Sequence, residues 1–158
     1  MVRSFRMSQK HYQQTHGIFH LTTNTKNAVP WCTYERMPMM LIEHLCKTRD
    51  IYEAELFAFC ILPNHLHCIL CPGPRGISRF MQSFKSNSTK ELRQNRQFTQ
   101  LGWQQGFHDE RIRDDAQRSA VVAYVQGNGM KHGLVKKITD WPWTSLHFPS
   151  LVDPMDIW

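Results

Sequence analysis

Residues 55–71, ELFAFCILPNHLHCILC, contain the pattern that decides the fold of this chain. Residues 55–62 are almost all apolar, which is typical of a central strand that is covered on both faces. Pro63 and Asn64 then favour a turn, and a second, largely apolar stretch covers residues 65–71. We therefore predict an antiparallel hairpin of two strands.

Two more strands are expected on either side of this hairpin in the sequence. Residues 17–25, GIFHLTTNT, alternate between two faces and are rich in aromatic and β-branched side chains, a pattern that favours a strand. Residues 107–112 are a further strand candidate. The sheet would then contain both a central hairpin and strands from distant parts of the chain.

Three helices are expected between and after these strands. The first opens at Pro38, the second has an apolar stripe and a basic face, and the third begins at a cap formed by Asp114 or Asp115. We expect the third helix to end at Asn128-Gly129. Their apolar positions are Leu41, Ile42, Leu45 and Cys46; Ile77, Phe80, Met81 and Phe84; and Val121, Val122 and Val125. This order of elements fits an α+β fold with an antiparallel sheet of ferredoxin-like type.

Length and composition limit the classes of protein to be considered. A chain of 158 residues has room for one well-filled core, so we expect a single domain over residues 1–158. No apolar run approaches the roughly 20 residues that span a bilayer, and the N-terminal residues lack a secretory signal. Five cysteines, an odd number, then favour reduced thiols and a cytoplasmic location. A formal net charge of +6 attracts polyanions, so nucleic acid is the leading class of partner. The alternative is that the charge only aids solubility.

The pair His65 and His67 is the sharpest chemical feature of the sequence. Alternate residues of a strand point to the same side, so two imidazoles at this spacing can bind one metal ion. A metallo-β-lactamase-like site would continue with an Asp-His pair, and a histidine-triad hydrolase would need a third histidine at position 69, where this chain has Ile69. Cys68 and Cys71 have a zinc-like spacing, but a strand would turn their thiols to opposite faces. A metallo-β-lactamase-like site, a histidine-triad hydrolase and a zinc site at the cysteines are therefore all disfavoured.

Tyr124 and Asn128 form a second polar pair. They are four residues apart in a predicted helix, so the phenol and the carboxamide would share one face. A tyrosine flanked by valines is also typical of a helix that packs into a core. From helical context alone, both interpretations stand.

Residues 62–67, LPNHLH, resemble the histidine-hydrophobe-histidine motif of the HUH endonucleases. The Pro-Asn-His-x-His form is similar to that of the single-tyrosine transposases, especially the REP-associated group. Further similar blocks are residues 20–25 (HLTTNT), 103–109 (WQQGFHD), 111–114 (RIRD), 124–128 (YVQGN), 131–135 (KHGLV) and 141–145 (WPWTS). The resemblance covers about residues 17–148.

This resemblance implies a ferredoxin-like, RRM-related domain and a transposase that cleaves and rejoins single-stranded, hairpin-bearing DNA through a 5′-phosphotyrosine. By position, His65 and His67 match the metal-binding pair, Tyr124 matches the nucleophile, and Asn128 matches a polar third ligand. The implied cofactor is Mg²⁺ or Mn²⁺. The family pattern usually has Asn-Pro where this chain has Asn128-Gly129, and glycine leaves the backbone looser. Water or His108 are candidates for the general base.

The basic face of the second predicted helix is a candidate DNA track or a merely solvated surface. Its cationic residues are Arg79, Lys85, Lys90 and Arg93. Trp141 and Trp143 either stack on bases or pin the C-terminal tail to the domain. Two other functions remain open: an RRM-like binding module without chemistry, and a metallonuclease that activates water. The site is expected either within one chain of a monomer or across a homodimer.

Overall fold

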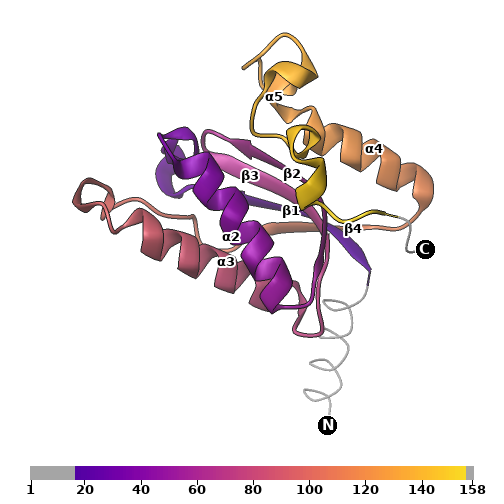
Figure 1. Cartoon of the computed structure of the whole chain (residues 1–158), viewed down its shortest axis with the longest axis horizontal. Helices are drawn as coiled ribbons and strands as arrows, with labels where there is room; N and C mark the ends of the chain where they lie inside the picture. The colour runs from indigo at the N-terminus through magenta and orange to yellow at the C-terminus, as the bar shows by residue number, and fades with distance from the viewer. Residues whose placement is uncertain (1–16, 156–158) are drawn as a thin grey trace.

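The computed structural model describes residues 17–155 and shows a four-stranded antiparallel sheet with helices on both faces (Figure 1). The strand order is β2 (Glu55–Leu62), β3 (His65–Cys71), β1 (Ile18–Asn24) and β4 (His108–Ile112). β1 pairs with both β3 and β4, so the N-terminal strand lies in the interior of the sheet. This is the strand order of a ferredoxin-like fold, and the predicted hairpin and fold class are confirmed.

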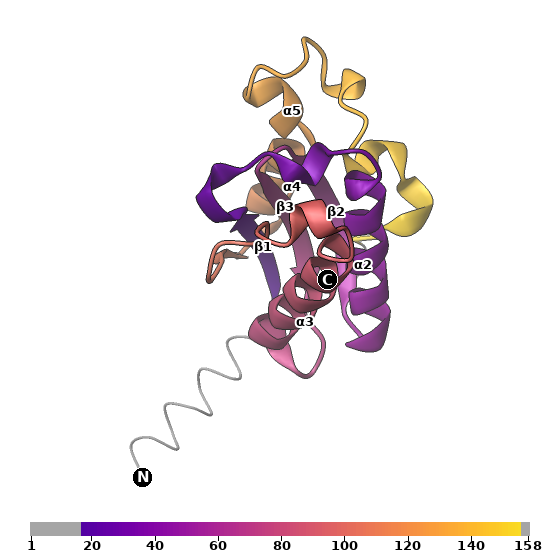
Figure 2. The same cartoon turned by 90° about the vertical axis from the view of Figure 1, so that its left-hand side faces the viewer.

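The helices divide between the two faces of the sheet. α2 (Met37–Ile51) and α3 (Gly76–Leu92) lie next to each other on one face (Figure 2). α4 (Asp115–Gln126) covers the other face, where it contacts β2, β3 and β4. Asp114 caps α4, because its carboxylate accepts a hydrogen bond of 2.7 Å from the backbone N–H of Gln117.

Strand alternation produces a separate apolar core on each face of the sheet. The core beneath α2 and α3 receives Leu66, Cys68 and Leu70 from β3. The core beneath α4 receives Ile69 from the same strand, together with Val125 from the helix. Cys68 and Cys71 pack against opposite cores, as predicted, and all five cysteines are free thiols.

The end of α4 differs from the prediction. α4 stops at Gln126, and Asn128-Gly129 begins a short helix, α5 (Asn128–Lys131), where we expected a helix end. Gly127 keeps its backbone hydrogen bond to Ala123 O, so the chain continues in almost the same direction. At the next step the side-chain Nδ2 of Asn128 donates to Tyr124 O, the carbonyl four residues earlier, at 2.6 Å. The asparagine therefore bridges the two helices.

The C-terminal segment runs along the free edge of β2. The backbone N–H of Ile61 donates to Trp143 O, and the Trp141 indole donates to Ile61 O, both at 2.8 Å. Farther along, the backbone N–H of Leu56 donates to the carboxylate of Asp153. Trp141 and Trp143 thus pin this segment to the domain and cover an edge that would otherwise expose unpaired backbone groups. In residues 17–155, no helix has the length and apolar character needed to cross a membrane.

Candidate active site

The face of the sheet beneath α4 carries polar side chains from two neighbouring strands. β3 contributes His65 and His67, whose ring centroids are 5.0 Å apart. β1 contributes His20 and Thr22, and Thr22 is paired with His67 across the sheet. Because paired residues of neighbouring strands project from the same face, the four side chains form one cluster.

Hydrogen bonds engage the Nδ1 nitrogen of each predicted metal ligand. The Nδ1 atom of His67 is 2.9 Å from His20 Nε2 and 3.0 Å from Thr22 Oγ1. The Nδ1 atom of His65 is 2.8 Å from Asn64 Oδ1. Within residues 17–155, no side-chain or backbone group hydrogen-bonds to either Nε2 atom. A proton on each Nδ1 leaves both Nε2 lone pairs free, which is the arrangement in which surrounding residues orient metal-binding histidines.

The environment keeps both imidazoles uncharged near neutral pH. Burial lowers the pKa of His67 to about 3, with smaller contributions from His20, His65, His132 and Lys131 nearby. Burial and the neighbouring His132 lower the pKa of His65 to about 4. Neutral imidazole is the form that binds a metal ion, so no proton has to be displaced first.

Tyr124 lies against the histidine cluster of its own chain. Its ring centroid is 5.9 Å from that of His67 and 5.9 Å from that of His20, both in edge contacts. The residue is 40% exposed, so it is not the core tyrosine that helical context alone also allowed. Lys131 donates a hydrogen bond of 2.7 Å to the phenol oxygen.

Asn128 is fully buried one helical turn beyond Tyr124. Its Nδ2 donates a hydrogen bond to Tyr124 O, but its Oδ1 has no hydrogen-bond partner among the described residues. An unpaired buried acceptor costs about 1–3 kcal/mol, so this oxygen is suited to a partner from outside residues 17–155. The next residue, Gly129, hydrogen-bonds through its backbone to Cys60, which is paired with His67 in the sheet. These contacts place α5, which begins at Asn128, against β2, the strand that pairs with the one carrying His65 and His67.

These residues fit a divalent metal ion. Two neutral imidazole nitrogens and one amide oxygen are a suitable partial ligand set for a borderline or hard ion with open positions. No group of three His, Cys, Asp or Glu side chains within residues 17–155 is arranged to hold a metal. The predicted set instead takes its third member from an asparagine, Asn128.

Gly129 replaces the proline of the related pattern for a physical reason. A Cβ atom at this position would come within 2.5 Å of Trp141 Cγ and 2.7 Å of Trp141 Cβ. The indole occupies the space that a larger residue would need, and it is anchored on Ile61 O. Close packing of Trp141 thus restrains the backbone that the loss of proline frees.

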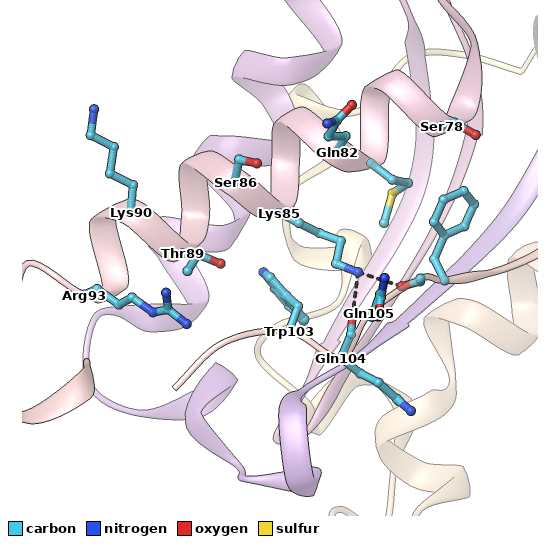
Figure 3. Close-up of a pocket in the computed structure, with 13 residues that line it drawn as sticks. Ser78, Gln82, Lys85, Ser86, Thr89, Lys90, Arg93, Trp103, Gln104 and Gln105 are labelled. Carbon is cyan, nitrogen blue, oxygen red and sulfur yellow. Dashed lines mark hydrogen bonds between the residues drawn. The ribbon is translucent and has the colours of Figure 1, made fainter. Parts of the chain in front are cut away.

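The predicted DNA-binding residues lie on α3 or, for Arg93, directly after it, on the face of the sheet opposite this cluster. Lys85, Lys90 and Arg93 line a hollow between α3 and residues 103–107, while Arg79 is exposed outside it (Figure 3). Lys85 points at the loop and donates to the carbonyls of Gln104 and Gly106 at 2.7 and 2.6 Å. Lys90 extends away from the loop. Lys85 therefore clamps the segment that leads into β4.

His108, a candidate general base, lies on the same face as the histidine cluster. It is paired with Thr22, which is paired on its other side with His67. Two interstrand spacings of about 4.8 Å therefore separate His108 from His67. None of its hydrogen bonds or ring contacts within the described residues reaches Tyr124.

Sequence reasoning gave no role to His20, Thr22 or Lys131. His20 and Thr22 are on one face of the first predicted strand, but only the register with β3 brings them to His67. Lys131 is seven residues after Tyr124, a spacing of about two helical turns. That spacing indicates a shared face only if the helix continues past Asn128, contrary to our prediction.

Comparison with known proteins agrees with this geometry. The sequence model of the IS200-like transposase family matches residues 13–128 of this chain. The chain belongs to the IS200-like transposase family. A REP-associated tyrosine transposase of Haemophilus influenzae is 35% identical over 113 residues, which are 64% of this chain and 64% of that protein. A REP-associated tyrosine transposase of Escherichia coli is 29% identical over 136 residues, covering 83% of this chain and 77% of that protein.

Solved structures of the family have the same fold. A REP-associated tyrosine transposase bound to a REP hairpin superposes with a TM-score of 0.71 at 26% identity, covering 90% of this chain and 85% of that one. A transposase structure from Deinococcus radiodurans, at 18% identity and a TM-score of 0.54, supports the fold alone. The predicted HUH transposase fold and the family are thus confirmed, and a divalent ion is compatible with both.

Proposed function

We propose that this chain cleaves and rejoins single-stranded DNA through a 5′-phosphotyrosine on Tyr124, with a divalent ion held by His65, His67 and Asn128. The observation that carries the proposal is the contact of the Tyr124 ring with His67 in one chain, with the residue 40% exposed. The named function of the relatives supports the same chemistry.

The residues around the proposed ion orient its ligands and do not themselves take part in the reaction. Thr22 and His20 contact the Nδ1 side of His67, and Asn64 contacts that of His65, which supports a role for the two Nε2 atoms as the ligands. When bound there, the ion would neutralise charge on the scissile phosphate and on the departing oxygen. The amide oxygen suits a hard ion and the two imidazoles suit a borderline one. We take Mg²⁺ or Mn²⁺ as the ion because the resemblance to the family implies it.

The covalent step exchanges one phosphodiester bond for another. The oxygen of Tyr124 bonds to phosphorus as its proton passes to water, the bond from phosphorus to the 3′ oxygen breaks, and that oxygen is protonated to a 3′-OH. An ordinary phenol, with a pKa near 10, is a better leaving group than an alkyl alcohol. A 3′-OH can therefore attack the phosphotyrosine later and release the enzyme.

The substrate we propose is single-stranded DNA that carries a hairpin. One relative of known structure is bound to a REP hairpin, and this chain has a net charge of +6. Lys90 and Arg79 on α3, and Arg93 directly after its last residue, are exposed and available for phosphates. Arg93 also donates through its Nε to Leu101 O at 3.0 Å, which leaves its other N–H groups for a phosphate. Lys85 is already engaged by two carbonyls, so we expect it to contribute less than the sequence suggested.

We further propose that the chain acts as one domain with its site in cis. Tyr124 reaches His67 without a second subunit, so a monomer has the required residues. The free thiols of all five cysteines agree with a reducing, cytoplasmic location.

Trapping the covalent intermediate tests the proposal. Wild-type protein is incubated with 3′-labelled hairpin DNA and Mg²⁺ or Mn²⁺, and the products are separated on a denaturing gel. We expect label at the mass of a protein–DNA conjugate, and its complete loss in Tyr124→Phe, which removes one oxygen and keeps the ring. Cleavage without a conjugate would identify a hydrolytic nuclease, and binding without cleavage would identify a binding module.

A further inference from the structure

Lys131 makes a direct contact with the atom that we propose as the nucleophile. Its Nζ donates a hydrogen bond of 2.7 Å to the Tyr124 oxygen and lies 4.0 Å from the centroid of the phenol ring. Lys131 is in α5, and its backbone N–H donates to Gly127 O at 3.1 Å. The helical path through Gly127 therefore places the ammonium at the end of the phenol.

The surroundings of this hydrogen bond make it suitable for catalysis rather than packing. Tyr124 and Lys131 are both exposed, so a phosphate can approach the oxygen that they share. The rings of His20 and His67 also contact the phenol ring, each at a centroid distance of 5.9 Å. An ammonium has three donors, so it can keep its bond to the phenol oxygen while another N–H turns to a phosphate oxygen.

The charge on the phenol oxygen changes during the reaction. When a 3′-OH displaces the phosphotyrosine, the bond from phosphorus to the Tyr124 oxygen breaks and its electron pair stays on that oxygen. A hydrogen bond from an ammonium to an anionic oxygen is roughly twice as strong as one between neutral groups. The interaction is thus stronger in the transition state than with the neutral phenol, which is the condition for catalysis.

We propose that Lys131 is a catalytic residue that stabilises negative charge on the Tyr124 oxygen as it enters and leaves the phosphodiester. In cleavage the phenol proton passes to water, and Lys131 keeps its own three protons. In rejoining, the 3′-OH gives its proton to water as its oxygen bonds to phosphorus, the bond from phosphorus to the Tyr124 oxygen breaks, the phenolate leaves beside the ammonium, and a proton from water restores the phenol. This role rests on the proposed function of Tyr124.

The test compares two lysines of the same region. Lys131→Met removes the ammonium and keeps an unbranched chain, Lys131→Arg retains a cationic donor, and Lys136→Met removes a charge from an exposed lysine outside the site. Single-turnover conjugate formation is measured at saturating hairpin DNA, rejoining is measured on isolated conjugate with added 3′-OH DNA, and binding is measured by fluorescence anisotropy.

We expect Lys131→Met to slow both cleavage and rejoining by roughly 10- to 100-fold, somewhat below the effect of a buried oxyanion donor. Its affinity for DNA should change no more than that of Lys136→Met, and Lys131→Arg should recover most of the rate. If Lys131→Met and Lys136→Met react equally fast while Tyr124→Phe forms no conjugate, the role of Lys131 is refuted and the proposed function stands. If wild type forms no conjugate, or Tyr124→Phe still does, the proposed function fails and this role fails with it.

Discussion

The buried histidine His67 makes a strong prediction about stability in acid. Only 5% of its surface is exposed, and its pKa in the folded protein is lowered to about 3, mainly by burial and to a smaller extent by neighbouring histidines and Lys131. In the unfolded chain the same imidazole has an ordinary pKa of about 6.5. As pH falls below about 6.5, this imidazole is therefore protonated in the unfolded state but not in the folded state. The free energy of unfolding decreases as a result.

The size of this penalty follows from linkage. Between pH 7 and pH 5, protonation of one imidazole in the unfolded state alone lowers the free energy of unfolding by about 2 kcal/mol. The stability is fully present above the unfolded pKa and is lost progressively as pH falls toward about 3. Since His65 contributes a loss of the same sign, only a comparison with a variant isolates the part due to His67.

The perturbation is His67→Gln, which retains a polar group near Thr22 and cannot titrate in this range. Urea denaturation followed by tryptophan fluorescence at pH 7, 6 and 5, with EDTA present, gives the free energy of unfolding of each protein. Wild type should lose about 2 kcal/mol more than His67→Gln between pH 7 and 5, whereas an exposed-site control, His147→Gln, should follow wild type. Parallel pH curves for wild type and His67→Gln would show that the imidazole is not buried in its neutral form.

Two further predictions concern the support of the site and the DNA track. Gly129→Ala should lower the free energy of unfolding by about 1–3 kcal/mol in urea denaturation, because the new Cβ meets the Trp141 ring at 2.5 Å. In a Trp141→Ala background the same change should cost less, and additive effects would show that the ring is not the obstacle. Lys90→Gln and Arg93→Gln should each flatten the salt dependence of DNA binding by roughly one unit of slope, as measured by anisotropy over a range of NaCl concentrations. Lys85→Gln should leave that slope unchanged, and a loss equal to that of Lys90→Gln would mean that Lys85 leaves its carbonyls to bind phosphate.

Local patterns in the sequence predicted most of the fold. Continuous apolar residues identified β2 and the alternation of residues 17–25 identified β1, because burial on two faces or on one imposes these periods. The same alternation predicted that His65 and His67 share a side while Leu66 enters the core, as it does. These properties depend only on neighbours along the chain, so a single sequence contains them.

The contacts of the cluster depend on pairing between distant segments, and local patterns do not encode that. The bond from His20 to His67 joins residues 47 positions apart, and a shift of β1 by one residue would turn His20 to the other face. The clamp formed by Lys85 needs the path of residues 103–107, which has no periodic pattern. A basic helix face looks the same in the sequence whether its cations are free or already bonded.

The arrangement of α4 explains how one helical segment serves both the core and the proposed chemistry. Val125 is fully buried against the sheet, so the preceding residue, Tyr124, is directed to the exposed rim where it meets the histidines. One turn later Asn128 is buried with an unpaired oxygen, and Gly129 is fixed by the packed indole of Trp141. The nucleophile and the third ligand are thus set by packing on both sides of a short interruption at Gly127. Because the packing of Val125 and Trp141 does not involve the phenol oxygen, the proposed reaction can change the charge of that oxygen without disturbing these packing contacts.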